Sequence, residues 1–241
     1  TVLSRGLGDV YKRQYINSMK EGKMKKTLFA TVLLAGMASS GVAADKLKSF
    51  DHAAELTSQA KTILFQELNT ADVPNTDHQQ IVCLAENIYF EARAESMEGK
   101  AAVANVTRNR VEDKRWPGTY CEVVQQGPVR ESWKTKQHAD LPDDQRVYYP
   151  RKHRCQFSWY CDGKKDIIWA NKEKSGLTIE GNARAWREAV RISIYVHGHG
   201  GFRVNDNTKG AVYYYAHNLV YPTWADQKDL TVIIGNHTFM K

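Results

Sequence analysis

The apolar residues between positions 81 and 92 recur at the spacing of one helix face, and this pattern constrains the fold more than any other in the chain. The series comprises Ile81, Leu84, Ala85, Ile88, Tyr89 and Ala92. Intervals of three and four residues are typical of a helix that faces a core. Thr76 and Gln79 precede the series with the spacing of a capping box. We therefore predict that a helical main domain, residues 77–241, opens here.

Weaker patterns predict further helices. An amphipathic stretch from Asp45 to about Leu68 is expected to be a helix that packs on the main domain or serves as a spacer, and the Pro-containing segment 69–75 a linker. A second helix of the main domain is predicted from about Glu98 to Val111, after a start near Ser96. Another is predicted from Arg184 to His197, ended by the glycine-rich turn 198–201.

Two runs near the C-terminus have the composition of strands. Residues 211–215 and 230–234 are dominated by β-branched and aromatic side chains. Residues 112–182 are rich in turns, Trp and Tyr and have weak periodicity, which favours a loop-rich binding region. The expected fold class is α+β, mostly helical with a small antiparallel β-sheet.

The N-terminal 44 residues have the pattern of a leader. A basic start at 24–26, an apolar run at 27–37 and small residues at 38–44 occur in the order of a secretory signal peptide. We predict a signal peptide over residues 24–44, cleavage before Asp45, export to the periplasm or medium, and no retained membrane anchor. Residues 1–23 are expected to be a translated upstream leader.

The basic charge of the chain is concentrated in that leader. The whole chain has a formal net charge of +7, but residues 1–44 hold seven of its 34 basic and two of its 27 acidic residues. The remaining chain therefore has a net charge of +2, without a dense basic stripe. We expect no nucleic acid partner.

Four cysteines in an exported chain favour disulfides. Cys155 and Cys161 bracket a short loop and could pair, which would leave Cys83 with Cys121. Four cysteines allow three connectivities, and the sequence does not choose among them. A zinc site is the alternative, but no Cys-x-x-Cys pair is present, so no metal is predicted.

Three glutamates lie within the segment ENIYFEARAE, residues 86–95. On the predicted helix that carries the apolar series, Glu86 falls opposite the apolar face and is expected to be solvated. Glu91 falls at the border of that face, near the helix end, where burial and the helix dipole would both raise its pKa and suit it to proton donation. Glu95 would lie near the same face if the helix continued. Arg93 or Arg110 could pair with either carboxylate and lower its pKa instead.

Five ordered blocks carry a family resemblance. They are YFEARAESMEGKAAVANVTRNRV (89–111), CEVVQQ (121–126), CQFSWYCDG (155–163), GAVYYYAHNLVYPTWA (210–225) and IIGNHTFM (233–240). In this order they resemble the catalytic domain of the spore cortex-lytic enzyme family of bacterial cell-wall hydrolases. The resemblance covers roughly residues 78–240. The family's peptidoglycan-binding repeat module is not evident in the sequence, which leaves a spore role open beside a general wall or phage role.

The resemblance implies a lysozyme-like fold related to lytic transglycosylases. It implies peptidoglycan as the partner and Glu91, in the EAR motif, as the catalytic acid. We also expect a monomer and no cofactor. A lytic transglycosylase needs one acid because the C6 hydroxyl of the muramic acid attacks the anomeric carbon, giving a 1,6-anhydromuramoyl end. A hydrolytic muramidase or glucosaminidase would need a second carboxylate, for which Asp162, Asp206 and Glu95 are the candidates.

Further residues are assigned supporting roles. Gln156, Ser158 and Trp159 offer an amide, a hydroxyl and a flat face to an N-acetyl sugar, although loop packing explains them equally well. Tyr89 is also assigned to substrate binding, and the resemblance suggests that the segment from Tyr215 to His217 borders the cleft. Alternation in a strand places Tyr213 and Tyr215 on one face and Tyr214 on the other. Asn109 and Arg110 are expected to brace the first helix of the main domain.

Two other functional classes remain open. A zinc amidase would draw its ligands from His197, His199, His217 and His237, although no supporting carboxylate–histidine spacing is present. A wall-binding module that keeps the fold without catalysis is the non-enzymatic alternative.

Overall fold

The computed structural model describes residues 54–168, 178–198 and 205–241. The predicted upstream leader, the signal peptide and the first nine residues of the 45–68 helix lie outside these ranges. A search of the described helices finds none long and apolar enough to cross a membrane.

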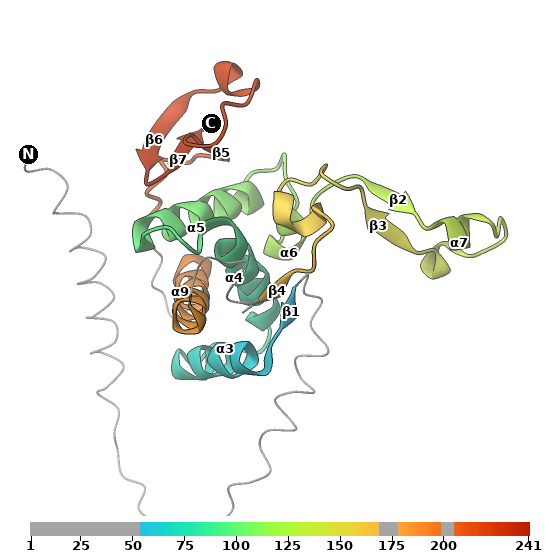
Figure 1. The fold of residues 1–241 in the computed structure, drawn as a ribbon, viewed down its shortest axis with the longest axis horizontal. Helices are drawn as coiled ribbons and strands as arrows, with labels where there is room; N and C mark the ends of the chain where they lie inside the picture. The colour runs from blue at the N-terminus through green and yellow to red at the C-terminus, as the bar shows by residue number, and fades with distance from the viewer. Residues whose placement is uncertain (1–53, 169–177, 199–204) are drawn as a thin grey trace, which may run out of the picture. The chain divides into compact units, whose positions relative to one another are not determined.

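The helical part is built around α4 (His78–Ala92). This helix packs against α5 (Met97–Glu112), α6 (Tyr120–Val124) and α9 (Ile179–His197), while α3 (Ser58–Thr70) packs on α9 (Figure 1). Every residue of the apolar series in α4 is buried, as the periodicity predicts.

Helix α3 is joined to α9 by polar contacts as well as apolar ones. The indole nitrogen of Trp186 donates a hydrogen bond to the carbonyl of Ala60 at 2.9 Å, and Arg191 Nε pairs with Glu67 Oε2 at 2.5 Å. Of the two roles open to this helix, the structure therefore shows packing on the rest of the domain.

Glu86 is not solvated, contrary to the prediction. Its side chain is fully buried, and its Oε1 accepts a hydrogen bond from the backbone N–H of Ala54 at 3.3 Å. Helix α4 is covered on several sides, whereas periodicity marks only its most apolar face. A polar residue on the opposite face can therefore still be buried where another segment supplies a hydrogen-bond donor.

Helix starts depend on local capping groups. The Ser96 hydroxyl accepts from the Gly99 N–H at 3.2 Å and starts α5, in agreement with the prediction. The prediction of a capping box at Thr76 is wrong. The residue that precedes α4 is Asp77, whose side chain does not cap the helix, and the Thr76 hydroxyl donates to the Asp77 carboxylate instead. The Thr57 hydroxyl caps α3 by accepting a hydrogen bond from the Ala60 N–H. Residues 54–57 are therefore not helical, contrary to the prediction of a helix from Asp45 to about Leu68.

Helix α9 begins earlier than predicted and ends as predicted. Its first residue is Ile179 rather than Arg184, because the Thr178 hydroxyl accepts from the Gly181 N–H at 3.0 Å. Its last residue is His197, followed by Gly198 with φ of 90°. This left-handed conformation favours glycine and closes the helix.

The C-terminal segment forms an antiparallel sheet of order β5-β7-β6, in which β5 (Tyr213–Ala216) and β6 (Leu230–Ile234) flank β7 (His237–Met240). Ile234 and Phe239 from this sheet pack with Ala102 and Val106 of α5. Helices and a small antiparallel sheet confirm the α+β class. The central strand β7 was not predicted.

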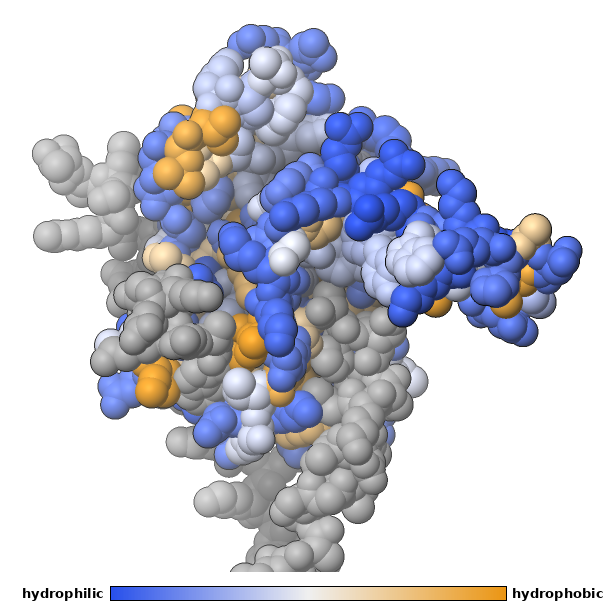
Figure 2. Space-filling model, turned by 45° about the vertical axis from the view of Figure 1, so that its right-hand side comes forward, coloured by the Kyte–Doolittle hydropathy of each residue, from blue (hydrophilic) through white to orange (hydrophobic). Residues whose placement is uncertain are grey.

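Two shorter pairs complete the strands of the described ranges. Strand β1 (Glu55–Leu56) pairs in parallel with β4 (Ile167–Ile168). Strands β2 (Val129–Glu131) and β3 (Tyr148–Pro150) form an antiparallel hairpin arm that reaches away from the helices, with the short α7 (Trp133–Lys136) at its end (Figure 1). Figure 2 shows a largely hydrophilic face with small, separate hydrophobic patches.

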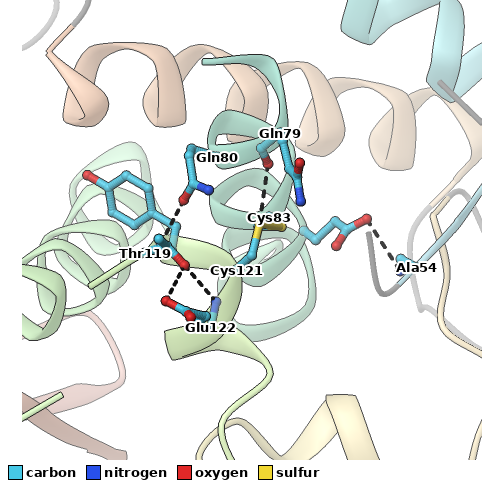
Figure 3. Close-up of a disulfide and its surroundings, with 9 residues drawn as sticks. Ala54, Gln79, Gln80, Cys83, Thr119, Cys121 and Glu122 are labelled. Carbon is cyan, nitrogen blue, oxygen red and sulfur yellow. Dashed lines mark hydrogen bonds between the residues drawn. A yellow bond between two sulfur atoms is a disulfide. The ribbon is translucent and has the colours of Figure 1, made fainter. Parts of the chain in front are cut away.

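Both disulfides have formed. Cys83 in α4 pairs with Cys121 in α6 (Figure 3), and Cys155 pairs with Cys161 across the short loop. The structure thus selects one of the three connectivities that the sequence left open. No cysteine of the chain remains for a zinc site or a thiol nucleophile.

Candidate active site

Glu91, in the last turn of α4, lines a cleft of about 360 Å³, here called the catalytic cleft. The other residues of its wall come from distant parts of the sequence: Phe90, Glu95, Ser158, Trp159, Ala216, Asn218, Leu219, Asn236 and His237. The end of α4, the 155–161 loop and one end of the sheet, where Ala216 pairs with His237, therefore meet around one carboxyl group.

The Glu91 carboxyl group is partly buried and hydrogen-bonded. The hydroxyl of Tyr214 donates to Glu91 Oε2 at 2.9 Å. Desolvation by burial raises the pKa of Glu91 above its usual value, while the Tyr214 hydrogen bond and the charge of Arg110 oppose this increase. The raised pKa agrees in direction with the expectation from the sequence.

Arg110 does not neutralise Glu91 by direct pairing. Its Nε donates to the carbonyl of Val212 at 2.8 Å, and its guanidinium carbon lies 4.4 Å from the ring centroid of Trp116 and 5.1 Å from that of Phe157. It is thus fixed between the residue that precedes β5 and two aromatic rings rather than bracing α4. From there it acts on Glu91 only as a charge at a distance.

The sequence did not predict Tyr214 as a site residue, nor the cleft residues Phe90, Asn218, Leu219 and Asn236. The alternation was predicted correctly: Tyr213 and Tyr215 both contact Trp224, whereas Tyr214 contacts Phe239, His237 and Glu91. Alternation does not say which face of a strand meets the cleft. The alternation of the three tyrosines could be predicted from the sequence. Which face points toward Glu91 depends on how the sheet packs on α5, and the sequence does not show this packing.

Glu95 lies three residues beyond the end of α4 and is held by the β6–β7 turn. The Asn236 side-chain amide donates to Glu95 Oε1 at 2.9 Å, and the Asn236 backbone N–H donates to Oε2 at 3.4 Å. Gly235, which precedes Asn236, has a φ of 57°, and a Cβ added there would collide with Glu95 Oε2. The glycine therefore permits both the turn and the close approach of the carboxylate.

His237 lies beside Glu95. Its Nδ1 is 3.9 Å from Glu95 Oε1. Burial lowers the pKa of His237, and His217 lowers it further, while Glu95 opposes the decrease. The imidazole is therefore favoured in its neutral form, in a cleft that also holds two carboxyl groups.

The 155–161 loop supplies two of its three predicted residues to the cleft. Ser158 and Trp159 line it, and the Trp159 ring stacks on Phe90 with centroids 4.5 Å apart. The Trp159 indole nitrogen donates to Asn87 Oδ1 at 3.0 Å, which fixes the ring. Gln156 is exposed, outside the cleft wall, and its backbone N–H bonds to the carbonyl of Gln126.

Three other predicted substrate residues occupy different places. Tyr89 is fully buried and its hydroxyl donates to Asn182 at 3.3 Å, so it supports α9 and cannot contact a ligand in this structure. Tyr215 packs against Tyr221 and Trp224, and His217 is exposed beside Thr238. Neither lines the cleft, although their neighbours Ala216 and Asn218 do.

Asn109 and Arg93 are not part of the wall of the catalytic cleft. The Asn109 amide donates to Asp206 at 3.0 Å, Thr208 at 3.3 Å and the carbonyl of Ala211 at 2.9 Å. It therefore holds the loop before β5 rather than bracing α4. Arg93 lies over the ring of Tyr89, with its guanidinium carbon 5.6 Å from the centroid.

Of the three candidates for a second acid, Glu95 shares the catalytic cleft with Glu91. Asp162 bonds to Lys164 at 2.9 Å. Burial alone would raise the pKa of Asp206, but hydrogen bonds from Thr208, Asn109 and Gly210 outweigh burial and lower it. Asp206 thus acts as a structural acceptor in the loop.

The histidines considered for zinc are dispersed. His197 Nε2 lies 3.4 Å from Asp77, whereas His237 begins β7 and His217 directly follows β5. His199 falls outside the described residues. Within the ranges that the structure describes, no three His, Cys, Asp or Glu side chains are grouped to hold a metal ion.

Glu91 thus offers a partly buried carboxyl group with a raised pKa in a cleft edged by aromatic rings, and such a group could donate a proton to a bound ligand. Residues 94–240 match the family model described as Cell Wall Hydrolase, and the chain belongs to this family. The family inferred from the five sequence blocks and the prediction of an enzyme are thereby confirmed. The matched range begins three residues after Glu91, so it includes Glu95 but not Glu91 itself.

Two solved structures are similar to this chain. One is the catalytic domain of the germination-specific lytic transglycosylase SleB from Bacillus anthracis, with 23% identity over 67% of this chain and 93% of that chain and a TM-score of 0.39. The other is the catalytic domain of the Bacillus cereus SleB protein, with 24% identity over 68% of this chain and 91% of that chain and a TM-score of 0.36. No curated protein matches the chain.

Proposed function

We propose that this protein cleaves the glycan strand of peptidoglycan between N-acetylmuramic acid and N-acetylglucosamine, with Glu91 as the general acid. The observation that carries the proposal is the Glu91 carboxyl group, which lines an open cleft and has its pKa raised by burial. Membership of the cell-wall hydrolase family supports the choice of substrate. The substrate lies outside the cytoplasm, which agrees with the predicted signal peptide at residues 24–44.

The chemistry needs one proton donor. Protonated Glu91 would transfer its proton to the glycosidic oxygen as the bond to the anomeric carbon breaks, and the leaving sugar would depart with a new hydroxyl. The C6 hydroxyl of the muramoyl residue would then bond to the anomeric carbon and give its proton to the Glu91 carboxylate. This lytic transglycosylase reaction consumes no water, restores the acid and leaves a 1,6-anhydromuramoyl end.

A hydrolytic reaction is the second candidate, and one observation favours it. Glu95 lines the same cleft as Glu91 and could act as the second carboxylate that a hydrolase requires. Its carboxylate already accepts hydrogen bonds from Asn236, which supports a positioning role equally well. The two reactions differ in product, since hydrolysis leaves a reducing sugar end.

The test is digestion of purified peptidoglycan by the wild-type protein and by Glu91→Gln. We expect the variant to lose activity by at least about a thousandfold, because Gln cannot donate a proton, yet still to sediment with peptidoglycan. Glu180→Gln, at an exposed position at the start of α9, is the matched control and should retain activity.

Mass spectrometry of the released fragments separates the reactions. Anhydro ends support the transglycosylase, and reducing ends support the hydrolase. Lysis retained by Glu91→Gln would refute the role of Glu91, and wild-type binding without cleavage would favour a wall-binding module.

A further inference from the structure

A second cleft, of about 350 Å³, adjoins the catalytic cleft and has no role in the chemistry above. Its charged wall residues come from the α4–α5 turn, α5 and α9: Arg93, Glu95, Lys100, Arg184 and Glu188. We call it the arginine cleft. Glu95 lines both clefts, so a substrate held at Glu91 has this second cleft beside it.

Two positive charges of the arginine cleft are not neutralised within the described structure. Lys100 is buried and its Nζ pairs with Glu188 Oε2 at 2.6 Å, and Glu95 accepts hydrogen bonds from Asn236. The guanidinium groups of Arg93 and Arg184 make no ion pair or hydrogen bond with any residue in the described ranges. Arg184 is exposed, and both are thus available to an anionic ligand.

The chemistry of these side chains favours a carboxylate. An arginine guanidinium presents paired N–H groups in a planar fork that fits a carboxylate with two parallel hydrogen bonds. In peptidoglycan, the lactyl group of muramic acid carries a peptide stem with free carboxylates. An extended chain advances about 3.3–3.6 Å per residue, so two or three stem residues would span about 10 Å from the muramoyl residue.

We propose that the arginine cleft binds a carboxylate of the peptide stem attached to the muramoyl residue in the catalytic cleft. This inference rests on the proposed function. Binding of the stem carboxylate makes the enzyme selective for glycan strands that still carry stems, and Arg184 is then a specificity-determining residue.

The test compares two soluble substrates: glycan strands with uncrosslinked stems, and the same strands from which an amidase has removed the stems. We expect the wild type to cleave the stem-bearing strands with roughly tenfold higher kcat/KM. Arg184→Ala should lose this preference while cleaving bare strands at the wild-type rate. Arg187→Ala is the matched control, because Arg187 lies on the same helix, pairs with Glu67 at 3.4 Å and is absent from the cleft wall.

The other outcomes are distinguishable. Equal wild-type rates on both substrates, or a loss in Arg184→Ala that is the same on both, would overturn the inference and leave the proposed function intact. If the wild type cleaves neither substrate, the proposed function fails. Calorimetry with the tripeptide L-Ala-γ-D-Glu-meso-diaminopimelate then decides the inference: binding that Arg184→Ala abolishes supports it, and no binding overturns it.

Discussion

Opposing effects set the acidity of Glu91. Burial raises its pKa, whereas the Tyr214 hydroxyl and the more distant Arg110 charge stabilise the ionised form. The net effect keeps the carboxyl group protonated to a higher pH than an exposed glutamate. A proton donor must hold its proton until the substrate oxygen accepts it, so this balance is a requirement of the proposed chemistry.

Replacing Tyr214 with Phe should change both the rate and the pH dependence of cleavage. Removal of the hydroxyl withdraws a hydrogen bond that favours the Glu91 carboxylate, so the pKa of Glu91 rises and the alkaline limb of the kcat/KM profile moves to higher pH. The rate should fall roughly tenfold, because a hydrogen bond to a charged group contributes about 1.5 kcal/mol or more.

The measurement is a pH–rate profile on soluble glycan strands. Tyr215→Phe is the control, since that ring lies on the opposite face of β5 against Tyr221 and Trp224. An unchanged alkaline limb in Tyr214→Phe would show that the hydroxyl does not act on the catalytic acid.

At the scale of elements, the β6–β7 turn fixes Glu95 between the two clefts. Gly235→Ala should destabilise the protein by about 1–2 kcal/mol, since an L-residue is disfavoured at positive φ. Because the new Cβ would collide with Glu95, cleavage of peptidoglycan should also decrease several-fold.

Thermal unfolding and wall-digestion assays check this pair of effects. Gly118→Ala is the control, because a Cβ there meets no heavy atom within 4 Å and its φ is not positive. Wild-type stability and activity in Gly235→Ala would contradict the role assigned to the turn.

Helices with one strongly apolar face could be predicted from the sequence, and elements defined by distant partners could not. The buried series of α4 and the Ser96 cap of α5 are local signals. Strand β7 has four residues and gains its hydrogen bonds from β5 and β6 on its two sides. The burial of Glu86 likewise depends on Ala54, 32 residues away.

The candidate site was predicted in part for the same reason. Glu91 could be selected because a helix border and a family motif coincide there, and Trp159 because it lies in a short aromatic loop. Tyr214 reaches Glu91, and Asn236 reaches Glu95, only through the folding of the sheet, at sequence distances of 123 and 141 residues from these carboxylate partners. Tyr89 was misassigned because adjacency to Glu91 along a helix does not imply the same face.

At the scale of the whole described domain, the two disulfides differ in the length of chain they close. Cys83 and Cys121 are 38 residues apart, whereas Cys155 and Cys161 are six apart. In the loop-entropy model, replacing the first pair with Ala should lower the free energy of unfolding by about 4 kcal/mol and the second by about 2 kcal/mol. Denaturant unfolding of the two double variants measures the two losses of unfolding free energy. A larger loss on removal of the Cys155–Cys161 disulfide would contradict this prediction.

The account depends most on the protonation of one side chain, which can be measured directly. Carbon NMR of the protein with labelled glutamate side chains, assigned with Glu91→Gln, gives the titration midpoint of the Glu91 carboxyl group. We expect a midpoint above the usual value of 4.5, because burial outweighs the Tyr214 hydrogen bond and the Arg110 charge. A midpoint at or below 4.5 would contradict the account, since Glu91 would then already be ionised where a proton donor is needed.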